Sequence, residues 1–429
     1  MKIAVVGAGY VGLVTAAGFA EAKHEVIVFD TSAKRIGDLM DGKVPFYEPG
    51  LPALLDRNRD RLTFTTSHAD TLQAGIVFVC VGTPTEDLGA ADLAAVEDVI
   101  ASYVGYPGLI VIKSTVPPGT AAGLARHFPD LRIASNPEFL AEGTAVDNCL
   151  HPSRVVIGGD APELVALYRA GSLYVLGTTE AELVKYASNY LLAAKVSLVN
   201  ELAQLASAIG ADVTKVLEAV GQDPRIGSAF LRPGIGWGGS CFRKDVSALL
   251  YEGQKLDLSM PLARAILDVN DRQRAQAASF ATALAKRAAG LDQPRIGVLG
   301  LAFKPGTDDL RDAPAVSIVH RLLADGNEVH VHDPVVQQSQ WPKPFRPGAK
   351  IVFDETLQAI LQSHVVLLAT EWPLYGRCLD WTQARPGTHV LDGRNFLDRD
   401  EIEAAGLFYH GVGRPSTKGA FEKKGGEKP

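Results

Sequence analysis

Residues 2–30, which read KIAVVGAGYVGLVTAAGFAEAKHEVIVFD, decide the fold of this chain of 429 residues. The apolar run Lys2–Val6 predicts a short strand, and the pattern that follows predicts a helix over Leu13–Ala22. A second apolar run over Glu25–Phe29 predicts another strand, which ends at Asp30. A strand, a turn, a helix and a second strand within so short a stretch indicate a βαβ unit with a parallel sheet.

The turn inside this unit carries Gly7, Gly9 and Gly12 in the spacing G-x-G-x-x-G. In such a turn the first glycine bends the chain, the second lets the backbone approach a pyrophosphate, and the third allows close helix packing. The helix N-terminus attracts the anion, and Asp30 is placed to accept hydrogen bonds from ribose hydroxyls. We therefore expect the cofactor to be NAD, with a vestigial Rossmann site as the alternative.

Three further apolar runs extend the predicted sheet, over Ala74–Val81, Leu109–Lys113 and Arg132–Ala134. Thr83 and Thr115 come soon after the first two of these strands. Because ligands of doubly wound folds bind at the carboxyl ends of the strands, both threonines are candidates for the edge of the cofactor site. For either one, the alternative is a capping or loop hydroxyl.

Two acids, Glu138 and Glu142, follow the last of these strands and stand four residues apart. A helical turn would place both carboxylates on one side. A solvated loop is the alternative for each of them.

A helix is predicted from Thr178 to about Gly210, with Glu182 as the partner in a capping box at its start. Lys185 and Asn189 stand four residues apart on this helix and share one face. An ammonium group beside an amide can stabilise an oxyanion, although a solvated face is the usual place for such a pair. A second long helix is predicted over Met260–Ala289, which we interpret as an element of a dimer interface.

The stretch PGIGWGGSCFRKD over residues 233–245 crowds glycines before Cys241 and places Asp245 four residues later. Glycine lets the backbone approach a bulky polar substrate closely. If a helix starts here, Asp245 lies one turn beyond Cys241, so that a nucleophile and an acid or base come together. A tight turn with a buried cysteine is the alternative.

From Arg295 onward the pattern of residues 2–30 recurs, because a strand over Ile296–Leu299 runs into Gly300, a helix, and a strand that ends at Asp333. We interpret this as an internal duplication, with two Rossmann-like domains around a helical middle. The second turn lacks the G-x-G-x-x-G pattern and carries Lys304. It is therefore expected to bind a phosphorylated ligand other than the dinucleotide.

The composition excludes several classes of protein. Acids outnumber Lys and Arg by 49 to 42, which argues against a nucleic-acid partner. The most apolar long segment, 191–209, contains charged residues, so no membrane span is expected. The start of the chain runs directly into a strand pattern rather than a signal peptide. The four cysteines show no C-x-x-C pair, which argues against a disulfide framework or a metal site and favours the cytoplasm.

Taken together, these motifs resemble the nucleotide-sugar dehydrogenases that oxidise UDP-glucose or GDP-mannose to the uronic acid. The resemblance covers nearly the whole chain and rests on GAGYVG at 7–12, VGTPT at 81–85, STVPPG at 114–119, NPEFLAEG at 136–143, KYASN at 185–189, GWGGSCFRKD at 236–245, LAFKPGTDDLR at 301–311 and DGRN at 392–395. It implies an NAD-dependent enzyme that works on UDP-glucose, with GDP-mannose or UDP-N-acetylmannosamine as the alternative sugar. A homodimer or higher homo-oligomer is implied as well.

The resemblance also implies a role for individual residues. In catalysis, Cys241 corresponds to the nucleophile, while Lys185, Asn189 and Asp245 handle protons and oxyanions, Glu138 serves the final hydrolysis and Thr115 holds a water. The implied cofactor contacts are Gly7, Gly9, Tyr10, Val11, Gly12, Asp30, Arg35, Thr83, Thr115, Glu142 and Arg311. The implied substrate contacts are Glu138, Phe139, Leu140, Lys185, Asn189, Arg225, Arg232, Gly234, Gly236, Lys304 and Arg394. Among these, Arg225 corresponds to an arginine that reaches across the dimer.

The predicted domains are an NAD-binding Rossmann domain over 1–177, a helical central domain over 178–290, a Rossmann-like domain for the UDP part over 291–414, and a disordered tail over 415–429. Two other functions compete with this prediction. A one-step hydroxy-acid dehydrogenase needs a Lys and Asn pair but neither Cys241 nor a second Rossmann half. An NAD-binding redox sensor without turnover would not need Lys185 and Asp245 beside the cysteine.

Overall fold

The computed structural model describes residues 1–86, 89–168, 171–290, 294–342 and 350–417. The chain divides into two compact units, Met1–Tyr190 with Lys244–Met260, and Leu191–Arg243 with Pro261–Pro429. Two of the three divisions fall inside helices α9 (Thr178–Ile209) and α11 (Phe242–Lys255), so both units share these helices, and the third falls directly before α12 (Pro261–Ala289). The predicted domain boundary at 290/291 adjoins residues outside the described ranges.

The first unit is built on an eight-stranded sheet in the order β3-β2-β1-β4-β5-β6-β7-β8. Six of its strands have the order of a doubly wound dinucleotide-binding fold, which confirms the predicted Rossmann domain. β7 then pairs antiparallel with β6, and β8 pairs parallel with β7. The strands are β1 (Lys2–Val6), β2 (Glu25–Phe29), β3 (Leu62–Thr65), β4 (Ile76–Val79), β5 (Leu109–Ile112), β6 (Arg132–Ser135), β7 (Arg154–Gly158) and β8 (Ser172–Leu176).

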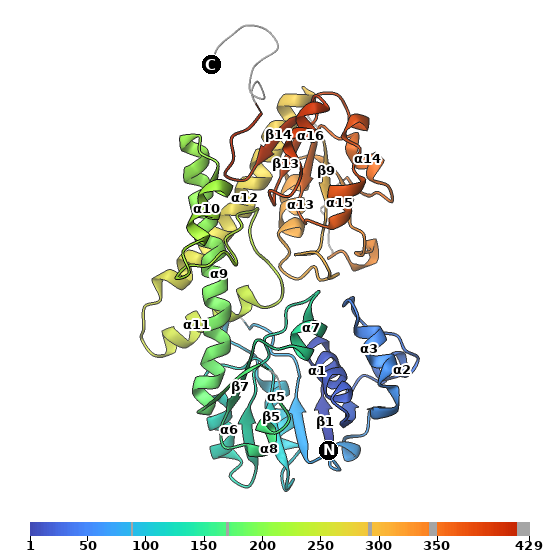
Figure 1. Ribbon diagram of the computed structural model, residues 1–429, viewed down its shortest axis with the longest axis vertical. Helices are drawn as coiled ribbons and strands as arrows, with labels where there is room; N and C mark the ends of the chain where they lie inside the picture. The colour runs from blue at the N-terminus through green and yellow to red at the C-terminus, as the bar shows by residue number, and fades with distance from the viewer. Residues whose placement is uncertain (87–88, 169–170, 291–293, 343–349, 418–429) are drawn as a thin grey trace. The chain divides into compact units, whose positions relative to one another are not determined.

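Helices cover both faces of this sheet, because the strands are apolar on both sides. In β1, Ile3 and Val5 belong to one buried cluster, and Ala4 and Val6 belong to a second cluster. The helices of the unit are α1 (Tyr10–Glu21), α2 (Ala33–Met40), α3 (Leu51–Arg57), α4 (His68–Thr71), α5 (Ala94–Ala101), α6 (Thr120–His127), α7 (Ala145–Leu150) and α8 (Pro162–Val165). Figure 1 shows α1 beside α7, in agreement with their contacts.

The opening βαβ unit forms as the sequence predicts, with one shift. α1 begins at Tyr10, three residues before the predicted start at Leu13, because Gly9 is the N-cap residue. The N-terminus of the helix therefore lies inside the glycine motif itself. This places its unpaired N–H groups beside the turn that was predicted to receive a pyrophosphate.

The second unit contains a six-stranded sheet in the order β11-β10-β9-β12-β13-β14. This order repeats that of the first six strands, and all the pairs are parallel, which confirms the predicted internal duplication. Asp333 accepts a hydrogen bond from the Leu301 N–H, just as Asp30 accepts one from the Ala8 N–H. The strands are β9 (Arg295–Leu299), β10 (Glu328–His332), β11 (Ile351–Phe353), β12 (Val365–Leu368), β13 (His389–Asp392) and β14 (Phe408–Gly411).

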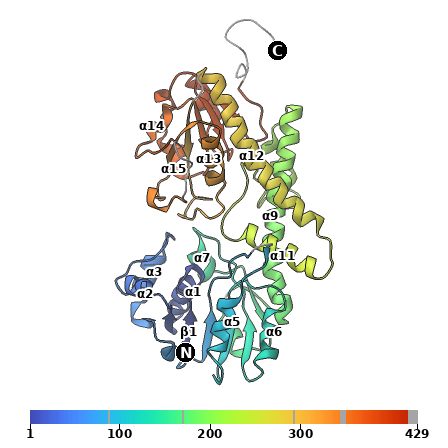
Figure 2. The same cartoon turned by 180° about the vertical axis from the view of Figure 1, so that it is seen from behind.

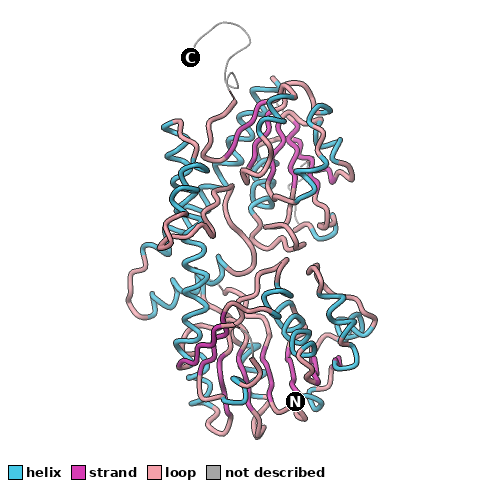
Figure 3. The backbone as a smooth tube through the Cα atoms, viewed as in Figure 1, coloured by secondary structure: helices cyan, strands magenta, loops and turns pink. Residues whose placement is uncertain are grey.

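Helices α10 (Val213–Gly221) and α12 (Pro261–Ala289) belong to this unit, together with the second part of α9. α12 packs along α13, as Figure 2 shows. Figure 3 shows the strands of the two sheets in magenta. The helices that surround the second sheet are α13 (Pro314–Ala324), α14 (Leu357–Leu361), α15 (Pro373–Cys378) and α16 (Arg399–Ala404).

The first residues of the predicted tail make hydrogen bonds to the last strand. The Thr417 N–H donates to the Tyr409 carbonyl over 3.0 Å, and the Ser416 hydroxyl lies 2.9 Å from Nδ1 of His410. Ser416 and Thr417 are therefore held against β14, and the Pro415 carbonyl accepts a hydrogen bond from Arg399 of α16. The rest of the predicted tail, residues 418–429, lies outside the described residues.

Candidate active site

The glycine motif of the first unit is shaped by close contacts. Gly7 has a φ of 101°, and a Cβ there would lie 2.7 Å from the Cys80 carbonyl oxygen. A Cβ on Gly12 would lie 1.8 Å from the Gly7 carbonyl oxygen, so the helix packs on the turn as predicted. At Gly9, a Cβ would have no atom of the described chain within 4 Å apart from its own residue and the two adjacent ones. The turn thus leaves open space at the helix N-terminus, which fits the pyrophosphate of NAD.

Asp30 ends β2 beside this turn and is 8% exposed. Its carboxylate accepts hydrogen bonds from the Ala8 and Ser32 N–H groups, each over 2.9 Å, and pairs with Arg35 over 2.9 Å. Burial acts to raise the pKa of Asp30, but these N–H groups and Arg35 outweigh it and hold the pKa below its usual value. Asp30 is therefore an anion next to the turn, which disfavours a ligand with a 2′-phosphate.

Tyr10 at the start of α1 contacts a carboxylate that the sequence analysis missed. Its hydroxyl donates to Glu48 over 2.5 Å, and Glu48 also accepts from the N–H groups of Gly143 and Ala145 over 2.6 and 2.8 Å. Glu48 is 2% exposed and connects α1 to the start of α7. It stands in an irregular segment before Pro49 and Gly50, where no periodicity signals a long-range contact.

The helical turn that would have placed Glu138 and Glu142 on one side does not form, and the alternative of a loop holds. Residues 136–141 are irregular, and the next helix, α7, begins only at Ala145. Backbone polar groups here are satisfied by side chains instead, since the Leu140 N–H donates to Glu138 over 2.6 Å. The two acids therefore take different positions, with Glu142 near Tyr10 and Glu138 paired with Lys185.

Glu138 and Lys185 form a buried ion pair at the end of β6. Lys185 Nζ lies 2.8 Å from Glu138 Oε1, and the two side chains are 5% and 7% exposed. Burial acts to raise the pKa of Glu138, but the charge and hydrogen bond of Lys185 lower it below its usual value. Glu138 is therefore ionised at neutral pH, and Lys185 is held in a fixed place on α9.

One turn further along α9, Asn189 contacts Asp245 from α11. Asn189 Nδ2 donates to Asp245 Oδ2 over 2.5 Å, and Lys244 Nζ lies 2.6 Å from the other carboxylate oxygen. Asp245 is 1% exposed. The predicted common face of Lys185 and Asn189 thus brings two acids from distant segments, Glu138 and Asp245, to neighbouring turns of one helix.

Thr83 and Thr115 contact each other at the carboxyl end of the sheet. The Thr83 hydroxyl donates to the Thr115 carbonyl over 2.8 Å, so the structure brings together the two threonines that the sequence placed there. Thr115 and Lys185 line a small pocket with Ser114, Ser135 and Glu182. This pocket borders the proposed catalytic residues of the first unit.

Glu182 does not form the predicted capping box. Its carboxylate accepts from the N–H groups of Gly119 and Ala121 over 2.6 and 2.9 Å, and from the Ser135 hydroxyl over 3.1 Å. It therefore caps the N-terminus of α6 rather than that of its own helix. A buried contact of this kind with a helix far away in the sequence outweighs the local capping pattern.

Lys113 is a second buried residue that the sequence analysis did not single out. Its ammonium donates to the carbonyl and to Oδ1 of Asn136 over 3.4 and 3.0 Å, and Asn136 Nδ2 donates to the Val156 carbonyl over 2.8 Å. Burial lowers the pKa of Lys113. This contact anchors the start of the segment that carries Glu138.

The glycine-rich loop before Cys241 lies in the second unit and is tied down by side chains of α9 and α12. The Gly234 N–H donates to Asn200 over 2.8 Å, and the Trp237 N–H donates to Asn270 over 2.8 Å. Cys241 is partly exposed, with its Sγ 3.6 Å from the Ser240 hydroxyl. α11 begins directly after Cys241, and Asp245 stands in its first turn, as predicted.

Among the predicted substrate contacts, Arg394 reaches the glycine-rich loop. Its Nη1 donates to the Gly236 carbonyl over 3.0 Å, and its Nε donates to the Ala369 carbonyl over 2.8 Å. Lys304 Nζ lies 5.4 Å from the centre of the Phe303 ring. In the first unit, the Phe139 ring lies 4.0 Å from the guanidinium carbon of Arg154.

The other predicted arginines lie on the surface of the second unit. Arg225 is paired with Asp223 over 2.6 Å, and Arg311 is paired with Asp309 over 2.6 Å. Arg232 is also exposed. The ligand contacts of these three arginines stay predictions.

Comparison with known protein families decides the class of the protein. Three family models match in order: the NAD binding domain of the UDP-glucose/GDP-mannose dehydrogenase family over residues 1–175, its central domain over 179–272 and its UDP binding domain over 297–399. The chain belongs to this family. It is therefore an NAD-dependent nucleotide-sugar dehydrogenase with two Rossmann-like domains around a helical central region.

Several relatives match over almost their whole length. UDP-glucose 6-dehydrogenase of Pseudomonas aeruginosa is 39% identical over 97% of this chain and 98% of its own. The structure of a UDP-glucose dehydrogenase from Pyrobaculum islandicum is 38% identical, with a TM-score of 0.86 over 96% of this chain and 98% of its own. A UDP-D-ManNAc dehydrogenase from Pyrococcus horikoshii is 28% identical, with a TM-score of 0.84 over 97% of this chain and 100% of its own.

Within the described ranges, no helix combines the length and the apolarity needed to cross a membrane. The same part of the chain contains no cluster of three or more His, Cys, Asp and Glu side chains arranged for a metal ion.

Proposed function

We propose that this dehydrogenase oxidises UDP-glucose to UDP-glucuronate through intermediates bound to Cys241. The observation that carries the proposal is the pair of buried contacts on α9, Lys185 with Glu138 and Asn189 with Asp245. Of these residues, Asp245 stands four positions after Cys241 in the sequence, in the first turn of α11. The names of the relatives that match at 38% and 39% identity favour UDP-glucose as the sugar nucleotide.

NAD supplies the hydride acceptor, and the turn around Gly9, Asp30 and Arg35 would hold it. A primary alcohol that loses one hydride and one proton becomes an aldehyde. Addition of the Cys241 thiol to that aldehyde gives a thiohemiacetal. Its carbon again carries a hydrogen that can leave as hydride. Its oxidation gives a thioester, and water then releases the carboxylate and the thiol. One sugar therefore requires two molecules of NAD and one of water.

The polar residues of the proposed site have distinct roles in this series of reactions. Lys185 and the amide of Asn189 stabilise the oxyanions that form when the thiol or water adds to a carbonyl carbon. Asp245 and Glu138 are the bases for the proton transfers, and Thr115 holds the attacking water. Because the pKa of Glu138 is lowered by Lys185, Glu138 is a carboxylate at neutral pH and can accept a proton from water.

The sugar nucleotide is tested by incubation of the purified protein with NAD and a panel of UDP-glucose, GDP-mannose and UDP-N-acetylmannosamine. We expect the highest kcat/KM with UDP-glucose and two NADH per uronic acid. A higher kcat/KM with either other sugar would reassign the substrate within the family. One NADH per sugar would indicate a one-step dehydrogenase, and NAD binding without turnover would indicate a sensor.

We further propose that the protein works as a homodimer in which α9 forms part of the interface. Its second half exposes a stripe of apolar side chains, with Leu191, Leu198, Leu202, Leu205 and Ile209 between 45% and 70% exposed. Contiguous exposed apolar surface on a helix favours association with a partner. Light scattering at the assay concentration tests this, since a fully active monomer would contradict it.

A further inference from the structure

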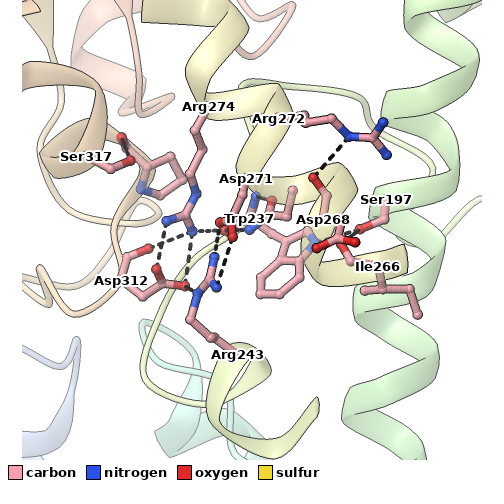
Figure 4. Close-up of polar contacts among 12 residues, drawn as sticks. Ser197, Trp237, Arg243, Ile266, Asp268, Asp271, Arg272, Arg274, Asp312 and Ser317 are labelled. Carbon is pink, nitrogen blue, oxygen red and sulfur yellow. Dashed lines mark hydrogen bonds and ion pairs between the residues drawn. The ribbon is translucent and has the colours of Figure 1, made fainter. Parts of the chain in front are cut away.

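Arg274 of α12 is buried among polar groups of two other segments, and Figure 4 shows these contacts. Its side chain is 6% exposed and binds Asp312 with both ends of the guanidinium, Nη1 to Oδ1 over 2.7 Å and Nη2 to Oδ2 over 3.0 Å. Nη2 also donates to the carbonyl oxygens of Asp312 and Trp237. One guanidinium thus joins the turn before α13 to the glycine-rich loop.

The turn at Asp312 has an unusual backbone conformation and lies against the glycine-rich loop. Asp312 has a φ of 47°, in the left-handed region that a residue with a side chain rarely adopts. The Gly239 N–H donates to the Arg311 carbonyl over 3.1 Å, and a Cβ on Gly238 would lie 2.2 Å from the Asp312 carbonyl oxygen. The loop and the turn therefore touch backbone to backbone, so movement of one displaces the other.

A second arginine extends this contact to the start of α11. Arg243 Nε lies 3.2 Å from Asp312 Oδ2, and its guanidinium also pairs with Asp271 of α12. Cys241 stands between Trp237 and Arg243 in the chain. Arg274 thus holds the chain four residues before the cysteine, at Trp237, and Asp312 holds it two residues after, at Arg243.

We propose that Arg274 is a positioning residue for Cys241. By holding Asp312 and the Trp237 carbonyl together, Arg274 fixes the position of the glycine-rich loop. In that position the Cys241 thiol adds to the aldehyde from the first oxidation before the aldehyde dissociates from the enzyme. The proposal rests on the proposed function, because it assumes addition of the Cys241 thiol to an aldehyde. A planar guanidinium is required, since the ammonium of lysine cannot make the two parallel bonds to a carboxylate.

The contacts of Arg274 with Asp312 and the Trp237 carbonyl are called the clamp below. Loss of the clamp is expected to change the products as well as the rate. If the thiol is misplaced, part of the aldehyde from the first oxidation escapes as its hydrate, having produced one NADH and no carboxylate. The ratio of NADH to carboxylate then rises above two. Displacement of a reacting group by about 1 Å can cost on the order of 100-fold in rate, so kcat for the carboxylate is expected to fall by about 10- to 100-fold.

The test compares Arg274→Lys and Arg274→Met with a matched control on the same helix. Arg272 stands two residues away on α12, its Nε donates to the Asp268 carbonyl over 3.3 Å, and its guanidinium points away from Asp312 (Figure 4). NADH is counted by absorbance, uronic acid by chromatography, and aldehyde by trapping with hydroxylamine. We expect both Arg274 variants to release aldehyde with a KM for NAD within about twofold of wild type, and Arg272→Met to keep the ratio of two.

The outcomes separate this proposal from the proposed function. A wild-type ratio other than two would overturn the proposed chemistry itself. A wild-type ratio of two, with the same ratio and an unchanged kcat in the Arg274 variants, would overturn the clamp alone. If the Arg274 variants do not fold, as judged by circular dichroism and melting, Asp312→Asn decides. That variant keeps the shape of the side chain, and wild-type kcat without aldehyde release would then refute the clamp.

Discussion

Two stacked histidines in the second sheet predict how the stability of the protein depends on pH. His389 Nδ1 lies 2.9 Å from His410 Nε2, their rings stack with centroids 5.2 Å apart, and the side chains are 5% and 1% exposed. Burial lowers the pKa of His410 to about 3, with a smaller contribution from His389, and burial also lowers the pKa of His389. In the folded protein both rings are therefore neutral at pH 7.

The sign of the effect follows from the lowered pKa. Above the unfolded pKa of about 6.5, neither state of His410 binds a proton and stability is unaffected. As the pH falls below about 6.5, the unfolded chain binds a proton that the folded protein does not, so the free energy of unfolding falls until the pH nears 3. For a folded pKa of about 3, the loss between pH 7 and pH 5 is about 2 kcal/mol from His410 alone.

The assay is urea unfolding followed by tryptophan fluorescence at pH 8, 7, 6 and 5. Every tryptophan of the chain lies in the second unit, so the signal reports the unit that contains these histidines. His410→Gln cannot take up the proton and is expected to lose about 2 kcal/mol less than wild type between pH 7 and pH 5. Its difference from wild type at pH 8 measures lost packing and is subtracted. Equal losses in the two proteins would refute the reasoning.

Three further predictions concern function. Cys241→Ala is expected to lose nearly all production of carboxylate while keeping some aldehyde formation. In the wild type, mass spectrometry is expected to detect a sugar bound covalently to Cys241. Unimpaired carboxylate production by the variant would contradict the mechanism. Asp30→Asn is expected to lower the preference for NAD, which is kcat/KM with NAD divided by kcat/KM with NADP, by about tenfold or more. The reason is that the substitution removes a carboxylate and frees Arg35 to contact a 2′-phosphate. An unchanged preference would show that Asp30 does not select the cofactor. Leu202→Glu, which puts a charge into the apolar stripe of α9, is expected to weaken the dimer by about 100-fold or more in light scattering, and an unchanged mass at all concentrations would remove α9 from the interface.

The sequence predicted the parts of the fold that depend on local patterns. The strand Glu25–Phe29 and the helix from Thr178 to about residue 210 have the predicted bounds or nearly so, because periodicity and turn residues determine them. The duplication was also predictable, since Asp333 repeats the position of Asp30 after a strand. The strands Arg154–Gly158 and Ser172–Leu176, which extend the first sheet, were not predicted.

The candidate site was predictable in its residue types and less so in its contacts. Helical spacing placed Lys185 and Asn189 on one face, but which acid each would meet depends on segments far away in the chain. The same limit explains Glu182, which has the local signature of a capping box and yet caps α6. Glu48 has no local signal, because its partners are backbone N–H groups that become unpaired only where α7 begins.

The two buried acids of the site have different surroundings, and this difference bears on how they divide the work. Glu138 is paired with the ammonium of Lys185, which lowers its pKa and keeps it ionised, so it is suited to accept a proton from water rather than to donate one. Asp245 receives the neutral amide of Asn189 on one oxygen and Lys244 on the other. Since Asp245 is also the acid nearest to Cys241 in sequence, it is the better candidate to exchange a proton with the thiol and its oxyanion adducts. Two carboxylates with distinct partners can therefore serve thiol addition and hydrolysis in turn, which a site with a single acid could not separate.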